Sequence, residues 1–230
     1  MFTHNNEFRD AFETIERLDE EAGRHYDVNG KPLPSVTTVI SHANRKKWAD
    51  WRRKVGEEEA NRVNRKATRR GTGFHKIAEV YIDNGDYESL KEWTPLAQLM
   101  FKAAKTHMDS RLDNIHCQEL QMYSEKLGCA GTVDLICEVD NELAVVDFKT
   151  AKAEKPEEWL EDYFVQLSAY WGMFSEKTGV VPRKLVVFLV GENGDVQIVE
   201  RRNIMHYLKT LQHYVRNFIQ FRDARSQGIK

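Results

Sequence analysis

Residues 131–150, GTVDLICEVDNELAVVDFKT, constrain the fold more than any other part of this sequence. Apolar and polar residues alternate on both sides of Asp140-Asn141, and residues of this kind favour a two-residue hairpin turn. If these two residues form the loop, Asp134 lies directly opposite Asp147 on the paired strand. The segment therefore predicts an antiparallel hairpin in which two carboxylates face each other.

The two faces of this hairpin have different character. Because strand side chains alternate between faces, Lys149 lies on the same face as Asp147. The reverse face is expected to pack into a core, since it carries Val133, Leu135, Cys137, Ala144, Val146 and Phe148.

Two opposed carboxylates destabilise a strand pair unless a cation lies between them. Oxygen ligands of this kind suit Mg²⁺ or Mn²⁺, so the polar face predicts a divalent-metal site with a lysine beside it. The alternative is an exposed ion pair between Asp147 and Lys149, with Asp134 in a turn.

The elements around the hairpin predict one α/β domain over residues 1–230. We expect a short helix over 1–20, extended chain over 23–40 and helices over about 44–66, 74–84 and 94–112. A strand then precedes the hairpin, a helix follows over 156–177, two strands surround GENGD, and a last helix covers 203–225. We divide the domain into an N-terminal segment (1–70), a catalytic core (71–202) and a C-terminal helix (203–230).

Composition and cysteine usage exclude several classes of protein. The chain is 41% hydrophobic and 30% charged, and no run approaches the roughly 18 apolar residues that a membrane-spanning helix needs. Its first residues lack the features of a secretion or transit signal, so we expect a cytoplasmic protein of a bacterium or a phage-infected cell. There are only three cysteines, Cys117, Cys129 and Cys137, and this odd, sparse count argues against a disulfide framework. Their spacing contains no CxxC, which argues against a structural zinc or iron–sulfur site.

Charge is distributed unevenly along the chain. The formal net charge is only -2, but residues 45–70 contain eleven basic and four acidic residues. Such a segment can follow a phosphate backbone, or it can be a solvated helix face held by ion pairs. Charge alone favours neither interpretation.

Four motifs together resemble the PD-(D/E)XK nuclease superfamily, and within it the RecB-like exonuclease branch. They are RGTGFH ending at His75, Asp134 in GTVD, Asp147-Phe148-Lys149 in VVDFKT, and Gln166 with Tyr170 in QLSAY. The phrase PSVTTVIS before a Trp-containing basic helix is similar to mitochondrial genome maintenance exonuclease and its phage relatives. The resemblance covers roughly residues 25–200 and implies a restriction-endonuclease-like core, with a mixed sheet (helix, three strands, helix, two strands) flanked by helices.

The resemblance implies roles for the matched residues. Asp134 and Asp147 would hold the metal ion, with the Phe148 carbonyl as a further ligand. Lys149 would orient or deprotonate the attacking water and stabilise the charge of the transition state. Two further candidates are His75, as a metal ligand or phosphate contact, and Glu119, which matches an acidic position ahead of GTxD in this branch.

Other residues are expected to contact DNA. Gln166 and Tyr170 would point at the scissile strand or the lysine, unless they form a half-buried seam. Arg70 and Thr72, at an expected helix break, would meet a phosphate together with free helix amides. Trp48 and Trp51 would stack on bases or pack against the core. The guiding basic residues would be Arg52, Arg53, Arg62 and Arg65.

These features predict a Mg²⁺- or Mn²⁺-dependent DNA exonuclease that acts on single-stranded or free-ended DNA in replication, recombination or repair, with proteins of those processes as candidate partners. A structure-specific or sequence-specific endonuclease would use the same site, and a non-catalytic nucleic-acid-binding module is the third alternative. RNA as a substrate stays open, since no feature reads the 2′-hydroxyl.

Overall fold

A five-stranded mixed sheet forms the centre of the computed structural model, which describes residues 1–20 and 23–226. The strands are adjacent in chain order, and only β6 and β7 run parallel. The predicted order of helix, three strands, helix and two strands is confirmed. The strands are β4 (Leu112–Ser124), β5 (Cys129–Val139), β6 (Glu142–Ala151), β7 (Lys184–Gly191) and β8 (Val196–Arg201).

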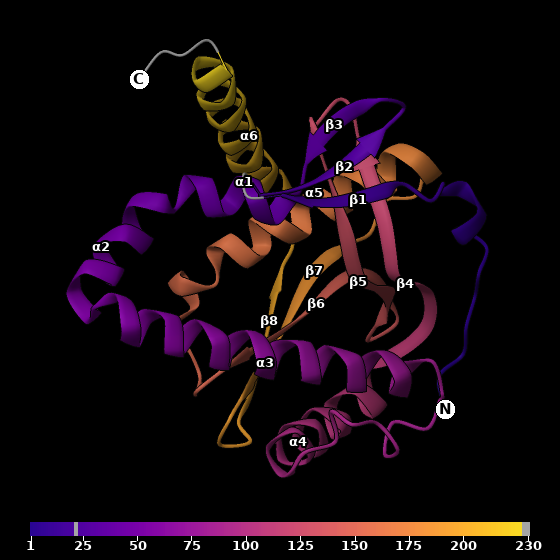
Figure 1. The fold of residues 1–230 in the computed structure, drawn as a ribbon. Helices are drawn as coiled ribbons and strands as arrows, with labels where there is room; N and C mark the ends of the chain where they lie inside the picture. Colours follow the sequence, from indigo (N-terminus) through magenta and orange to yellow (C-terminus); the bar gives the residue numbers. More distant parts are fainter. Residues whose placement is uncertain (21–22, 227–230) are drawn as a thin grey trace.

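Helices cover both faces of this sheet, as Figure 1 shows. On one face α3 (Glu57–Ile82) and α4 (Pro95–Arg111) pack against Val146 and Phe148 of β6. On the other face α5 (Glu161–Thr178), α6 (Ile204–Ser226) and α1 (Val36–Ala43) pack against Val145 of the same strand. Alternating β6 residues thus enter two separate cores, so the sheet is buried on both sides.

The predicted hairpin is confirmed, and its apolar face is confirmed except at Val133. Leu135 of β5 pairs with Val146 of β6 in the expected register, with Asp140 and Asn141 in the turn. The six predicted core residues are buried, five of them in the core under α3 and α4, whereas Val133 lies in the core under α5. The last helix ends at Ser226, and residues 227–230 of the predicted C-terminal segment lie outside the described residues.

The helix expected over residues 1–20 is wrong. The segment contains a single 3-10 turn (η1, Arg9–Ala11) and strand β1 (Glu16–Glu20). β1 pairs with β2 (Gly23–Val28), which pairs with β3 (Lys31–Pro34) through a turn at Asn29-Gly30. Pairing with a neighbouring strand therefore decides the conformation here over a weak helical pattern.

The extended chain expected over 36–40 is also wrong, because this β-branched run forms α1. The Ser35 side chain caps the helix by accepting a hydrogen bond from the Thr38 backbone N–H at 3.0 Å. Val36 and Val39 are buried against the core. β-branched residues lower helix propensity only slightly, so a cap and a buried face outweigh it.

The helix break expected at residues 70–73 lies instead at Gly56. α2 (Arg45–Val55) ends there, and Gly56 has a φ of 88°, which favours glycine. α3 then runs without interruption through Gly71 and Gly73. Arg70 and Thr72 therefore lie inside a helix, so the prediction of free helix amides there is wrong, whereas a phosphate contact by their side chains stays a prediction.

Within residues 1–20 and 23–226, no helix has both the length and the apolar character that crossing a bilayer requires.

Candidate active site

The candidate site lies where β5 and β6 separate. Their paired residues end at Leu135 and Val146, one residue short of Asp134 and Asp147. Asp134 turns its carboxylate to the Phe148 backbone N–H, which donates to Oδ2 at 2.9 Å. Both acids therefore lie where the two strands separate, and they are not a paired position of the β5–β6 ladder.

Glu119 faces the same opening from β4. The pairs of Gln118 with Leu135 and of Leu120 with Val133 place Glu119 opposite Asp134. Its φ of 46° is unusual for a residue with a side chain and marks a local distortion of the strand. Such distortions re-aim side chains next to functional sites.

His75 of α3 completes a cluster that suits a metal ion. Its Nδ1 lies 3.5 Å from Oδ2 of Asp134. One ligand atom from each of His75, Glu119 and Asp134 lies within 4.8 Å of the other two. One imidazole nitrogen and two carboxylate oxygens form a donor set that fits Mn²⁺, and carboxylates also suit Mg²⁺.

Asp147 lies beside this cluster in an unusual environment. The residue is only 1% exposed, and its Oδ1 has no hydrogen-bond partner within the described residues. Burial raises the pKa of Asp147 to about 6, and the nearby Asp134 carboxylate adds to this, although the Lys149 ammonium opposes both. A buried carboxylate oxygen without a partner is the kind of group that a bound cation would satisfy.

Lys149 forms an ion pair with Asp147, at 2.6 Å between Nζ and Oδ2. Burial lowers the pKa of Lys149, but the carboxylates of Asp147 and Asp134 outweigh it, and the pKa is raised. In this arrangement Lys149 is a cation suited to stabilising negative charge. A lysine that acts as a general base would need a lowered pKa.

Tyr163 lies beside this ion pair, although no motif in the sequence points to it. The Lys149 ammonium lies 5.2 Å from the centroid of its ring, which is within cation–π distance. Tyr163 precedes Gln166 by three residues and Tyr170 by seven, so helical spacing puts all three on one face of α5. This helical spacing is the sequence signal that could have identified Tyr163.

Tyr170 of α5 packs against β5, and Gln166 lies one helical turn before it. Tyr170 is buried, and Nε2 of Gln166 donates to its hydroxyl at 3.4 Å. A Cβ built on Gly131 would lie 2.8 Å from Cε1 of Tyr170, so the tyrosine ring packs directly on the strand that carries Asp134. This contact explains why a glycine precedes the acid in GTVD.

We expect Gly131→Ala to lower the free energy of unfolding by about 1–3 kcal/mol, because a methyl group there overlaps the Tyr170 ring. Gly71→Ala is the matched control. Its Cβ would lie 3.7 Å from Thr150 Oγ1 inside α3, so we expect a gain of about 0.5–1 kcal/mol. Urea unfolding of the two variants measures both effects. Equal stability of both variants would contradict the packing and the helix assignment.

The basic residues expected to guide DNA have different surroundings. Arg52 pairs with Glu57, Arg53 with Asp50, and Arg62 with Glu59. These three thus have the ion pairs expected of a solvated helix face, and their contact with DNA stays a prediction. Arg65 has no ion pair among the described residues, whereas Arg70 pairs with Glu192 and donates to Oγ1 of Thr150 at 3.1 Å.

The two tryptophans of α2 do not pack into a core. Trp48 is 52% exposed, Trp51 is half-buried, and their rings meet edge to face at a centroid distance of 6.1 Å. Stacking on bases stays a prediction for this pair.

Fold and site together define an α/β protein with a candidate metal centre of carboxylates, a histidine and a lysine at one opening of its sheet. A sequence profile described as the PD-(D/E)XK nuclease superfamily matches residues 49–226, more than half of the chain. The chain belongs to this superfamily. The restriction-endonuclease-like fold expected from the motifs is confirmed.

A solved structure is also similar to this chain. It is the crystal structure of a protein from Eubacterium rectale described as a candidate exonuclease, with 14% sequence identity and a TM-score of 0.47. The alignment covers 70% of this chain and 69% of the other. No curated protein matches the sequence.

Proposed function

We propose that this nuclease is a divalent-metal-dependent DNA exonuclease that acts on single-stranded or free-ended DNA. The observation that carries the proposal is the convergence of His75, Glu119 and Asp134 beside the buried Asp147–Lys149 pair. DNA replication, recombination or repair is the proposed setting. In this proposal residues 1–230 act as one nuclease domain.

The residues would divide the work as follows. His75, Glu119, Asp134 and Asp147 would hold Mg²⁺ or Mn²⁺, and a bound divalent ion lowers the pKa of water and neutralises charge on a phosphate. The Phe148 N–H holds the Asp134 carboxylate in place. The Lys149 ammonium would stabilise the charge that develops on the phosphate oxygens. The Phe148 carbonyl stays a proposed ligand.

We expect Mn²⁺ binding to tighten as the pH rises from about 6 to about 8. Desolvation by surrounding protein atoms, together with the carboxylates of Asp134, Glu79 and Asp147, raises the pKa of Glu119 to about 8, although the residue is exposed on one side. Below that pH a proton must leave before the oxygen can bind the ion. Each proton released changes the Kd by up to about tenfold per pH unit.

Titration calorimetry with Mn²⁺ at several pH values measures this dependence. Glu119→Gln should weaken binding and remove the pH dependence between about 7 and 8, because it removes the group that titrates there. Glu88→Gln, at an exposed position outside the cluster, is the control. Binding that does not change with pH, or equal effects of both variants, would contradict the ligand assignment.

A gel time course tests the activity itself. End-labelled linear single-stranded DNA and its circular form are incubated with Mg²⁺, Mn²⁺ or EDTA. Metal-dependent loss of the linear strand alone is the result expected of an exonuclease. Loss of both forms would assign the protein to the endonucleases, and no loss with any metal would favour a binding module. A matched RNA strand tests the sugar preference.

A further inference from the structure

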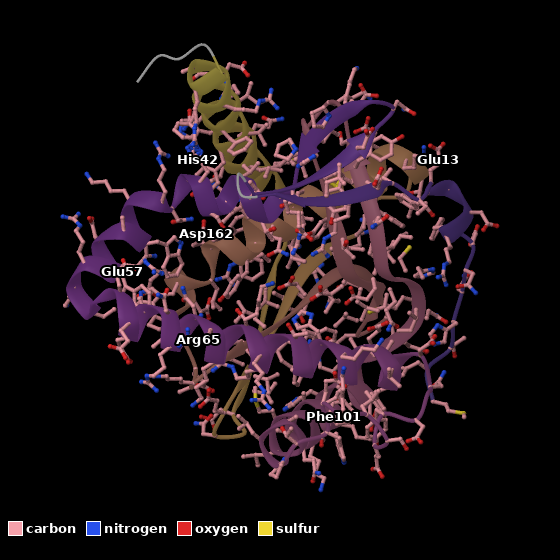
Figure 2. The ribbon with its side chains drawn as sticks, in the orientation of Figure 1. Glu13, His42, Glu57, Arg65, Phe101 and Asp162 are labelled. Carbon is pink, nitrogen blue, oxygen red and sulfur yellow. The ribbon has the colours of Figure 1, made fainter. Side chains whose placement is uncertain are left out.

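A basic groove separate from the metal cluster lies between α3 and α4. Its volume is about 870 Å³. Figure 2 labels one residue on each of the two helices, Arg65 on α3 and Phe101 on α4. Basic side chains line it on both walls, with Arg65, Lys66, Arg69 and Arg70 from α3 and Lys91 from the segment before α4.

The groove extends along α3 away from the metal cluster, and its lining residue Thr72 comes three residues before His75. Arg70 connects the two regions, since it lines the groove and donates to Thr150, the residue after Lys149. A ligand in the groove would therefore extend along α3 from the neighbourhood of the metal cluster.

The charge of the groove is incompletely neutralised. Lys66 and Arg70 share one carboxylate, that of Glu192, and Lys91 lies 3.9 Å from Glu92. Arg65 and Arg69 have no ion pair within the part of the chain that the structure describes. Five cations thus face two carboxylates, which produces a positive potential that attracts an anion.

Apolar side chains line the same groove beside these charges. Half-buried Leu96 and Ala97 present apolar surface to it, whereas Phe74 and Met100 also border it but are buried. A mononucleotide or an inorganic anion would use the cations alone or a small part of this space. A strand of nucleic acid presents both regularly spaced phosphates and apolar base faces, so it matches both features along the groove.

We propose that this groove binds a single-stranded segment of the nucleic-acid substrate that lies away from the scissile phosphate. Arg65, Arg69 and Lys91 contact its phosphates, and its bases lie against Leu96 and Ala97. The inference rests on the proposed function, because it assigns a second binding region to the same substrate. In this proposal the strand contacts both walls of the groove. A strand that followed only the exposed basic residues of α2 and α3 would not contact Lys91.

Fluorescence anisotropy with a labelled long oligothymidylate in EDTA tests the groove without cleavage. Arg65→Glu with Arg69→Glu changes one wall, and Lys91→Glu changes the other. All three residues are exposed or at the groove rim, and thermal melting checks that each variant is folded. Lys209→Glu with Arg216→Glu, an equal charge change on exposed positions of α6, is the control.

We expect the Arg65/Arg69 pair to weaken binding by about tenfold or more and to flatten its salt dependence. The slope of log Kd against log salt should fall by about 0.7 for each phosphate that the variant no longer neutralises. Lys91→Glu should weaken binding in the same direction, and the α6 control should have a small effect. No effect of Lys91→Glu, or equal weakening in the groove and control variants, would overturn the proposal. The proposal would also be overturned if thymidine monophosphate competed for the groove as effectively as the strand does.

Cleavage assays on the unmodified chain separate this inference from the proposed function. Groove-dependent binding by a chain without nuclease activity would support the groove and reject the proposed function. Metal-dependent cleavage combined with binding that the groove variants leave unchanged would reject the groove and keep the function.

Discussion

Asp147→Asn is expected to reduce metal-dependent cleavage of DNA by at least about 10³-fold while the chain stays folded. The substitution keeps the size and shape of the side chain but removes the negative charge next to the metal cluster. Because Oδ1 of Asp147 has no hydrogen-bond partner among the described residues, the folded protein does not depend on a contact to that oxygen.

Cleavage rates of linear DNA with saturating Mn²⁺ measure this effect, and thermal melting checks the fold. Asp10→Asn, an exposed aspartate near the N-terminus, is the matched control and should cleave at the rate of the unchanged chain. A folded Asp147→Asn protein that cleaves within tenfold of that rate would exclude Asp147 from the active site.

Lys149→Met is expected to lower the cleavage rate by about 10²- to 10³-fold and to leave Mn²⁺ binding intact or tighter. The ammonium supplies positive charge at the site but is no metal ligand, and it competes with a cation for the Asp147 carboxylate at 2.6 Å. Lys149→Arg should restore little activity, since a planar guanidinium cannot take the place of a compact ammonium in a buried site.

Lys155→Met is the control for this experiment. The Lys155 ammonium lies at the same distance of 5.2 Å from the Tyr163 ring centroid, and it donates to the Tyr163 hydroxyl at 2.8 Å. It therefore reproduces the loss of one cation beside Tyr163 without removing the partner of Asp147. If both variants lose the same activity, the effect belongs to the packing around Tyr163, and the role assigned to Lys149 is wrong.

The elements that local pattern specified strongly were predicted well. The hairpin of β5 and β6 has clear alternation around a turn dipeptide, and its register is as expected. The errors concentrate where local signals conflict. Residues 36–40 favour a strand by composition, but the Ser35 cap and the buried face of α1 make them helical. Gly71 and Gly73 look like a break, but the buried side chains of α3 hold the helix through them.

Sequence alone determined that Asp147 and Lys149 share a face near Asp134, because the two-residue period of strands and a tight turn leave few alternatives. The family resemblance named His75 and Glu119 as candidates, but only the tertiary structure placed them beside Asp134 and added Tyr163. These three come from a helix, another strand and a second helix, on both sides of the sheet, and their distances depend on how the two cores pack. Periodicity shows which face a residue occupies, but packing between elements sets which faces meet.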